Sequence, residues 1–195
     1  MATQPDTRER ILAAALDLFC RLGYTAVGTQ EICDAAGVLK GSMYHFFRSK
    51  LEIALAALTH FGESSVEDFA GIASGPGTPA EKVLAIFEME YGVAVRQKAK
   101  HGRVYGCFLA NASSEMAPKD DSVRSCVHRL YGLWHEAIRP IFAESQKKST
   151  ALDQARMLFA VMNGSILAAI VANDPEQIRK LGRQAPKLFG FAAVA

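Results

Sequence analysis

Helix-start signals recur along this chain and confine it to the all-α class. A side chain that can cap a helix is followed three residues later by a carboxylate at Asp6, Ser49, Thr78 and Thr150, which is the spacing of a capping box. Apolar residues then recur at helical spacing, and no stretch alternates with the period of two that is typical of strands. The pattern predicts an all-α fold of about nine helices.

Glycine and proline residues divide the predicted helices. The expected spans are 6–22, 30–37, 40–46, 49–70, 79–97, 103–115, 121–147 with a kink at Pro140, 150–173, and a last helix from 174. We expect an N-terminal domain over residues 1–50, which contains the first three helices, and a helical domain over 51–195.

The overall charge of the chain does not indicate a nucleic-acid binder, because the formal net charge is only +2. Any electrostatic attraction must therefore come from a local arrangement. The N-terminus has no apolar signal-peptide core, and the longest apolar stretch, 157–172, is short for a bilayer and contains Asn163 and Gly164. We expect a cytoplasmic protein without a membrane span. The four cysteines lack metal-ligand spacing and are expected to be thiols.

The stretch GVLKGSMYHFFRSK, residues 37–50, has four basic or imidazole side chains and no acid. On a helix of 100° per residue, Met43, Phe46 and Phe47 form one apolar face, and the opposite side carries the polar residues and Gly41. A helix of two turns needs a scaffold to be stable. Two helices joined by a glycine turn, the second displaying polar groups, indicate a helix-turn-helix that fits a DNA major groove.

Groups around this helix suit phosphate as well as base edges. Thr29 is expected to cap the second helix, whose free N–H groups would then bind an anion. Lys50 stands at the start of the fourth helix, and Tyr44 can donate a hydrogen bond to phosphate. The alternative is an ordinary solvated surface over a core plug. The combination of short helices, turn glycine and acid-free stretch favours DNA binding.

Two stretches of the N-terminal region resemble the DNA-binding domain of the tetracycline-repressor (TetR) family: RERILAAALDLFCRLGYTAVGTQEICDAAGV and KGSMYHFFRSKLEIALAAL. The resemblance implies an N-terminal helix-turn-helix and a C-terminal helical domain that binds an effector and dimerises. It also implies a set of residues that contact DNA: Gln30, Lys40, Gly41, Ser42, Tyr44, His45 and Lys50, to which the anion-site argument adds Thr29.

Two positions depart from the family pattern. Leu39 stands where many relatives have Ser, Thr or Pro, so the recognition helix lacks an ordinary capping side chain, worth about 1 kcal/mol. Cys33 replaces a small alanine, and we interpret it as a small buried residue rather than a sensor.

The last two predicted helices are candidates for a homodimer interface. The helix over 150–173 is apolar nearly all round, so it must be buried on more than one side. Gly164, Ala168 and Ala169 would allow a partner helix to approach closely, and the last helix adds Ile178 and Leu181, with Leu188 and Phe189 beyond them. Burial inside one chain is the alternative.

Effector-binding residues are harder to predict. Aromatic residues are common in the middle helices, and a pocket needs a few polar groups among them; the candidates are Asn111, Tyr131, Trp134 and Asn163. Neither a metal nor a cofactor is expected.

Residues 105–124, YGCFLANASSEMAPKDDSVR, resemble a pattern in the family branch of the N-ethylmaleimide reductase repressor, an electrophile sensor in which the matching cysteine is reactive. That cysteine is Cys107 here, downstream of the basic run RQKAKHGR. Nearby cations and a helix N-terminus would favour its thiolate. The other interpretation, a small buried thiol, is the commoner state of such a cysteine and is favoured.

Taken together, these patterns predict a repressor that a small-molecule or electrophile effector releases from operator DNA. An activator of the same fold, or a helical binding protein or enzyme with a vestigial first domain, are the alternatives. No nucleophile–base pair or phosphate loop supports an enzyme. The operator, the effector and the sign of regulation are not encoded in any motif.

Overall fold

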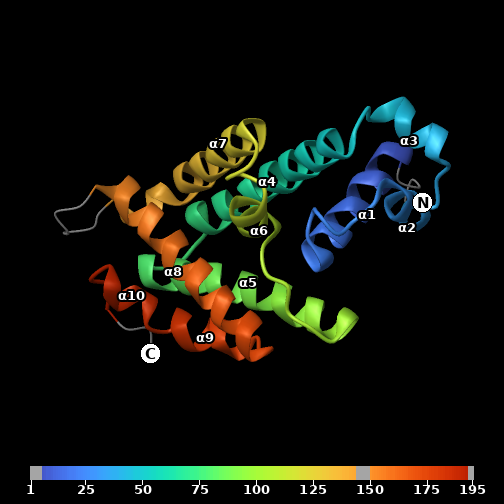
Figure 1. The fold of residues 1–195 in the computed structure, drawn as a ribbon. Helices are drawn as coiled ribbons and strands as arrows, with labels where there is room; N and C mark the ends of the chain where they lie inside the picture. Colours follow the sequence, from blue (N-terminus) through green and yellow to red (C-terminus); the bar gives the residue numbers. More distant parts are fainter. Residues whose placement is uncertain (1–5, 144–149, 193–195) are drawn as a thin grey trace, which may run out of the picture. The chain divides into compact units, whose positions relative to one another are not determined.

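The computed structural model describes residues 6–143 and 150–192, which fold into helices joined by turns (Figure 1). No strand occurs among these residues, which confirms the all-α class. The helices are α1 (Thr7–Leu22), α2 (Thr29–Ala36), α3 (Lys40–Phe46), α4 (Lys50–Ser74), α5 (Pro79–His101), α6 (Phe108–Glu115), α7 (Asp121–Ile138), the 3₁₀ segment η1 (Arg139–Phe142), α8 (Ala151–Ala172), α9 (Glu176–Gly182) and α10 (Ala185–Leu188).

Four of the long helices, α1, α4, α5 and α8, begin at the capping residues that the sequence predicted. Asp6 and Thr78 each form a capping box with the glutamate three residues on. The Ser49 hydroxyl accepts the N–H of Glu52 at 3.1 Å, and the Thr150 hydroxyl accepts that of Asp153 at 3.1 Å. These bonds satisfy backbone donors that have no partner inside the helix.

Helices α4 and α5 each run four residues past their expected ends, and two other boundaries were wrong by more. Residues 103–107 are not helical, because Gly106 has φ +82° and the side-chain amide oxygen of Gln97 accepts the N–H groups of Tyr105 and Gly106 at 2.8 and 3.1 Å. The helix predicted to continue through Pro140 ends at Ile138, and the proline is the second residue of the 3₁₀ turn η1, which begins at Arg139. The end of that prediction, 144–147, lies outside the described residues.

The chain divides into two compact units. The first contains Met1–Glu63 and Cys107–Leu130, and the second contains Ser64–Gly106 and Tyr131–Ala195. Helices α4 and α7 contribute residues to both units. The division differs from a simple cut at residue 50, because α6 and the first half of α7 join the N-terminal helices; the domain boundary itself stays a prediction.

Glycines allow close packing inside each unit. A Cβ at Gly62 of α4 would lie 2.7 Å from Leu130 of α7, and a Cβ at Gly182 of α9 would lie 2.7 Å from Phe87 of α5. The α5–α9 contact is reinforced by Arg179, whose guanidinium lies 2.7 Å from the Glu88 carboxylate. Helix α9 is therefore firmly fixed to α5.

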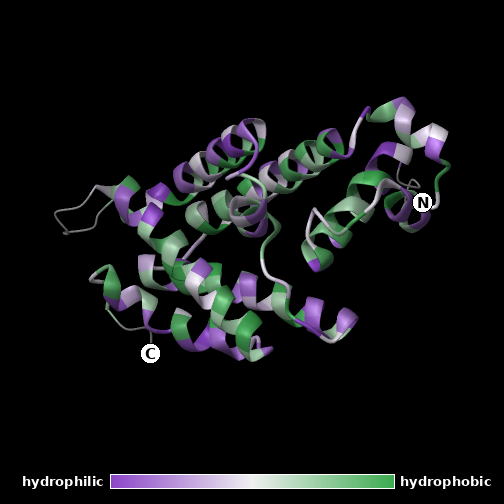
Figure 2. Cartoon of the chain, viewed as in Figure 1, coloured by the Kyte–Doolittle hydropathy of each residue, from purple (hydrophilic) through white to green (hydrophobic). Residues whose placement is uncertain are grey.

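Helix α8 is more apolar than its neighbours. Its 22 residues are long and apolar enough to span a bilayer by length and composition, although 39% of the apolar window is buried inside the protein. This corrects the expectation that the stretch is too short, but one such helix is also what the core of a globular protein contains. By contrast, α7 shows both hydrophilic and hydrophobic residues along its length (Figure 2).

Candidate nucleic-acid interface and effector residues

The scaffold of the first unit is a three-helix core. Helix α1 buries Ile11, Leu12 and Phe19, and both α2 and α3 pack against it. Met43 of α3 is fully buried, and its sulfur lies 3.4 Å from the thiol of Cys33. Burial raises the pKa of that thiol, so Cys33 is the small buried residue expected.

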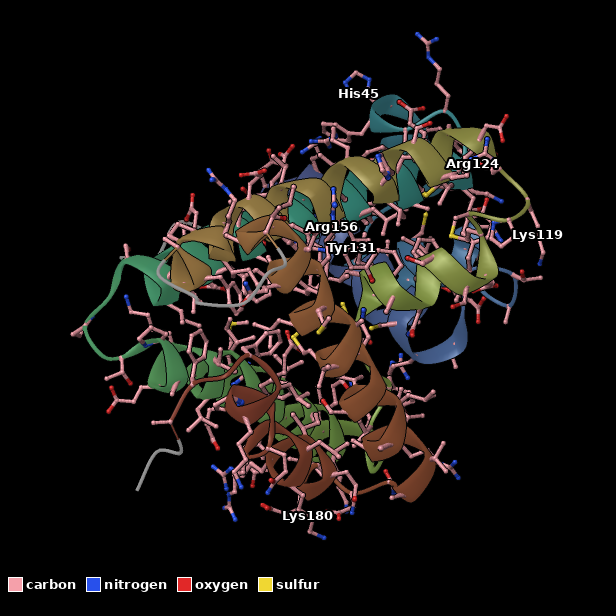
Figure 3. The ribbon with its side chains drawn as sticks, turned by 90° about the vertical axis from the view of Figure 1, so that its left-hand side faces the viewer. His45, Lys119, Arg124, Tyr131, Arg156 and Lys180 are labelled. Carbon is pink, nitrogen blue, oxygen red and sulfur yellow. The ribbon has the colours of Figure 1, made fainter. Side chains whose placement is uncertain are left out.

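Helix α3 presents six of its seven residues to solvent: Lys40, Gly41, Ser42, Tyr44, His45 and Phe46. Tyr44 is 45% exposed, and the His45 imidazole stands clear of the ribbon (Figure 3). Nothing lies within 4 Å of the place where a Cβ on Gly41 would be. A flat partner can therefore approach the backbone of α3 closely.

One residue assigned to the core of α3 was misplaced. Phe46 is 39% exposed, whereas Met43 and Phe47 are buried. Phe47 follows the last turn with extended dihedral angles, so it leaves the helical spacing on which the prediction relied. Its ring lies 5.7 Å from the Arg8 guanidinium, and the Phe46 ring lies 5.2 Å from the His45 ring.

Thr29 does not cap α2. The N-cap is Gly28, whose N–H is accepted by the Glu31 carboxylate at 2.7 Å. Thr29 is the first helical residue and is half-buried, so the anion site expected at its hydroxyl lacks the predicted geometry. Gln30 is exposed, and its side-chain amide donates to Asp34 at 2.8 Å.

Lys50 has a structural role in addition to any contact with DNA. Its ammonium donates to the carbonyl oxygens of Tyr24 and Val27, each at 2.9 Å, and lies 4.2 Å from the centre of the Tyr24 ring. The side chain therefore ties the start of α4 to the turn between α1 and α2. Sequence spacing alone could not reveal this, because the two carbonyls lie more than twenty residues away.

Helix α6 is attached to the same turn by a carboxylate. Glu115 accepts the N–H groups of Tyr24 and Thr25, both at 2.8 Å. Burial pushes the pKa of Glu115 upward, but the hydrogen bonds from Thr25 and Tyr24 outweigh it and leave the pKa below its usual value. Phe108 of α6 also stacks on Phe19 of α1, with centroids 6.1 Å apart. We call the Glu115 contact the α6 latch.

The five effector candidates fall into different units. Cys107 and Asn111 belong to the first unit, in which Cys107 is the N-cap of α6 and only 6% exposed. The Asn111 amide donates weakly, at 3.5 Å, to the carbonyl of Cys20 at the end of α1. These contacts show packing of α6 against α1 and favour the buried interpretation of Cys107.

The other three candidates are brought together in the second unit. The Asn163 amide donates to the Tyr131 hydroxyl at 3.4 Å, and the Tyr131 and Trp134 rings meet edge to face at 5.6 Å. Trp134 is 2% exposed and stacks with Phe159 at 5.7 Å. Tyr131 and Asn163 are half-buried polar groups beside this aromatic cluster, which is the composition of a ligand-binding wall.

Sequence reasoning missed Glu90. Glu90 is half-buried, and at helical spacing it interrupts the row of buried residues Val83, Ile86 and Ala94 on α5. Within the described residues its carboxyl accepts no hydrogen bond. Burial raises its pKa to about 7, and the charge of Arg96 opposes that rise only partly. An acid in an apolar helical stripe was the signal that would have found it.

Two cavities lie within single units. One of about 670 Å³ lies where α4 ends and α5 begins and includes Ile72, Pro76 and Lys82; another of about 220 Å³ lies beside the α6 latch. None of the five effector candidates lines either cavity. Among the described residues, no group of three or more His, Cys, Asp or Glu side chains could hold a metal.

Comparison with known proteins adds to this geometry. Residues 11–57 match the model of the bacterial regulatory proteins of the tetR family, and residues 79–184 match the LmrA/YxaF-like C-terminal domain of transcriptional regulators. The HTH-type transcriptional repressor NemR of Escherichia coli is 28% identical over 188 residues, covering 90% of each chain. LmrA of Bacillus subtilis, an HTH-type transcriptional regulator, is 25% identical over 94% of this chain and 96% of its own.

A solved structure is similar along nearly the whole chain. The crystal structure of reduced E. coli NemR superposes with a TM-score of 0.81 at 25% identity, covering 97% of this chain and 100% of that one.

Proposed function

Because the chain belongs to the tetR family of bacterial regulatory proteins, we propose that α3 docks in the major groove of an operator and that an effector releases it. The exposed face of α3, held by a buried Met43, is the observation that carries this proposal. A recognition helix must offer polar groups outward and be rigidly supported behind. Regulators of this family act on DNA and are generally not enzymes. Because bacterial DNA lies in the cytoplasm, we expect the protein to act there.

A homodimer would place two α3 helices on one DNA face, about 34 Å apart. Support comes from a row of exposed small and apolar residues on α8 whose spacing alternates between three and four: Met157, Ala160, Gly164, Leu167 and Val171. This is the spacing of a helix–helix seam. Leu181 of α9 and Leu188 of α10 are further exposed apolar residues in the last helices. We call these residues the α8–α10 surface.

The burial of individual side chains shortens the list of residues that we expect at the dimer interface. Ala169, Ile178 and Phe189 are buried inside their own unit, so they cannot contact a partner. Gly164 is exposed with open space around it and remains suited to close approach by a partner helix.

The effector is proposed to be a small molecule bound beside the aromatic cluster of Tyr131 and Trp134, with Asn163 as a polar contact. The alternative trigger, electrophilic attack on Cys107, needs an accessible thiolate, and a 6% exposed thiol argues against ready attack. The α6 latch supplies a route to the DNA-binding helices, because a shift of α6 would pull the turn between α1 and α2 through Glu115.

A binding assay tests the proposal. Full-length protein should retard DNA from the promoter regions beside its own gene, and Tyr44→Ala should weaken this by about tenfold, as expected for loss of a hydrogen bond to a charged phosphate. Circular dichroism should show equal folding, because Tyr44 is exposed. Equal binding by both proteins would contradict the proposal. A reporter in cells distinguishes repression from activation.

The thiol question has its own test. Wild-type protein and Cys107→Ser should be treated with an electrophile and then assayed for DNA binding. The buried interpretation predicts the same response from both, and loss of binding by the wild type alone would make Cys107 the sensor.

A further inference from the structure

Leu39 is the most exposed large apolar side chain of the first unit among the residues described. It is 80% exposed, against 48% for Leu22 and 39% for Phe46. A leucine left in water gives up the free energy that burial would supply. A single exposed leucine is ordinary at a protein surface, so the place of Leu39 directly before α3 is the feature that matters.

Stability does not explain Leu39 either. It is the N-cap of α3, with extended dihedral angles, and no side-chain hydrogen bond caps the helix. Serine, threonine, asparagine or aspartate at this position would satisfy a free N–H of the first turn. Leu39 thus neither caps α3 nor is buried, although it stands directly before Lys40, Gly41 and Ser42 of that helix.

The position of Leu39 at the start of α3 indicates which partner could bury its side chain. Residues at the N-terminus of a recognition helix reach base edges in the major groove. There the thymine C5-methyl is the apolar group that such a side chain can contact. Gly41, two residues on, leaves space for the groove to come close.

Resting on the proposed function, we propose that Leu39 reads sequence by packing its methyl groups against the C5-methyl of a thymine in each operator half-site. In the complex, DNA would bury the leucine side chain that is exposed in the free protein. Lys40 beside it would position the helix on phosphate, so that affinity and sequence preference come from neighbouring residues.

The test removes one methyl group at a time from the DNA. Full-length protein first selects its operator from a random duplex pool. Each thymine of the selected operator is then replaced by deoxyuridine in both half-sites, and Kd is measured by fluorescence anisotropy at fixed salt. Loss of one buried methyl should weaken wild-type binding about fourfold per half-site at one position.

Protein variants identify the residue that senses this methyl. Leu39→Ala should bind the thymine operator more weakly and should not distinguish thymine from deoxyuridine at that position. The control Leu22→Ala, which removes an exposed leucine from α1, should keep the wild-type discrimination. Leu39→Ser should gain a helix cap and unfold at a higher urea concentration while still losing discrimination, which separates binding from stability.

Several results would overturn the inference. Discrimination that survives in Leu39→Ala, equal binding of all deoxyuridine operators by wild type, or a selected operator without thymine would each do so. These results leave operator binding itself intact. If the wild type selects no sequence at all, the proposed function fails and this inference fails with it.

Discussion

At the scale of single residues, two lysines predicted to face DNA have different surroundings. Lys40 is exposed, and its side chain makes no hydrogen bond within the described part of the chain. Lys50 donates to two backbone carbonyls in the turn before α2. The sequence predicted both lysines as DNA-binding candidates. It could not show which of them stabilises the fold, because that depends on contacts with residues distant in the sequence.

Exchange of each lysine for methionine should separate these roles. Lys50→Met leaves two carbonyls without their charged donor and should lower the free energy of unfolding by about 1–3 kcal/mol. Lys40→Met should leave urea unfolding unchanged, weaken binding to all DNA sequences, and reduce the slope of log K against log salt by about one. Equal unfolding curves for Lys50→Met and wild type would contradict the structural role.

Glu90 should make stability depend on pH. Its folded pKa of about 7 lies above the ordinary 4.5, so the stability associated with its neutral form is present below pH 4.5 and is lost as pH rises through 7. Glu90→Gln keeps the neutral shape at every pH. The variant should match wild type in urea unfolding near pH 5 and be more stable at pH 8.

A constant difference between the two proteins at pH 5 and pH 8 would show that Glu90 does not titrate in this range. Glu88→Gln is unsuitable as a control, because Glu88 pairs with Arg179. Glu67→Gln, at an exposed position of the same unit, is the better one.

At the scale of elements, local signals predicted helix starts well. Thr78 and Thr150 act as caps as expected, and α3 begins and ends at the predicted residues. The predicted start of α6 was wrong because the side chain of Gln97, on the preceding helix α5, holds the backbone of residues 105–106 out of the helix. A capping bond joins residues three apart, whereas the contact of Gln97 with residues 105–106 comes from another helix. The arrangement of the effector candidates likewise depends on contacts between helices, which local signals do not predict.

The α6 latch gives a prediction at this scale. Glu115→Gln replaces a carboxylate that accepts two N–H groups, so urea unfolding at pH 7 should show a loss of about 1–3 kcal/mol. The wild-type pKa is lowered, so its contribution is present above pH 4.5 and is lost as pH falls through the lowered pKa. The difference between the two proteins should therefore shrink in acid; a difference that grows in acid would contradict the latch.

At the scale of the whole molecule, the proposed function pairs two chains. The α8–α10 surface leaves Leu167 60% and Val171 81% exposed in one chain. Such apolar exposure along one helix is typical of an oligomer interface. Twofold pairing through this surface would match a twofold-symmetric operator.

Leu167→Glu should convert the dimer to a monomer in sedimentation analysis, because it places a charge in the apolar seam. Operator affinity should fall with it, since a monomer contacts one half-site only. Val95→Glu, at a 38% exposed apolar position of α5, is the matched control and should remain dimeric. A monomeric wild-type protein that binds operator tightly would contradict this arrangement.

The central claim is that the exposed face of α3 lies on DNA. Its most direct measurement is photo-cross-linking from a benzoylphenylalanine placed at His45, compared with the same group at exposed Lys180 of α9. If α3 lies on DNA, the group at position 45 should cross-link to bases of the operator, and the group at position 180 should not. Operator DNA that cross-links to position 180, or that binds without any cross-link to position 45, would contradict it.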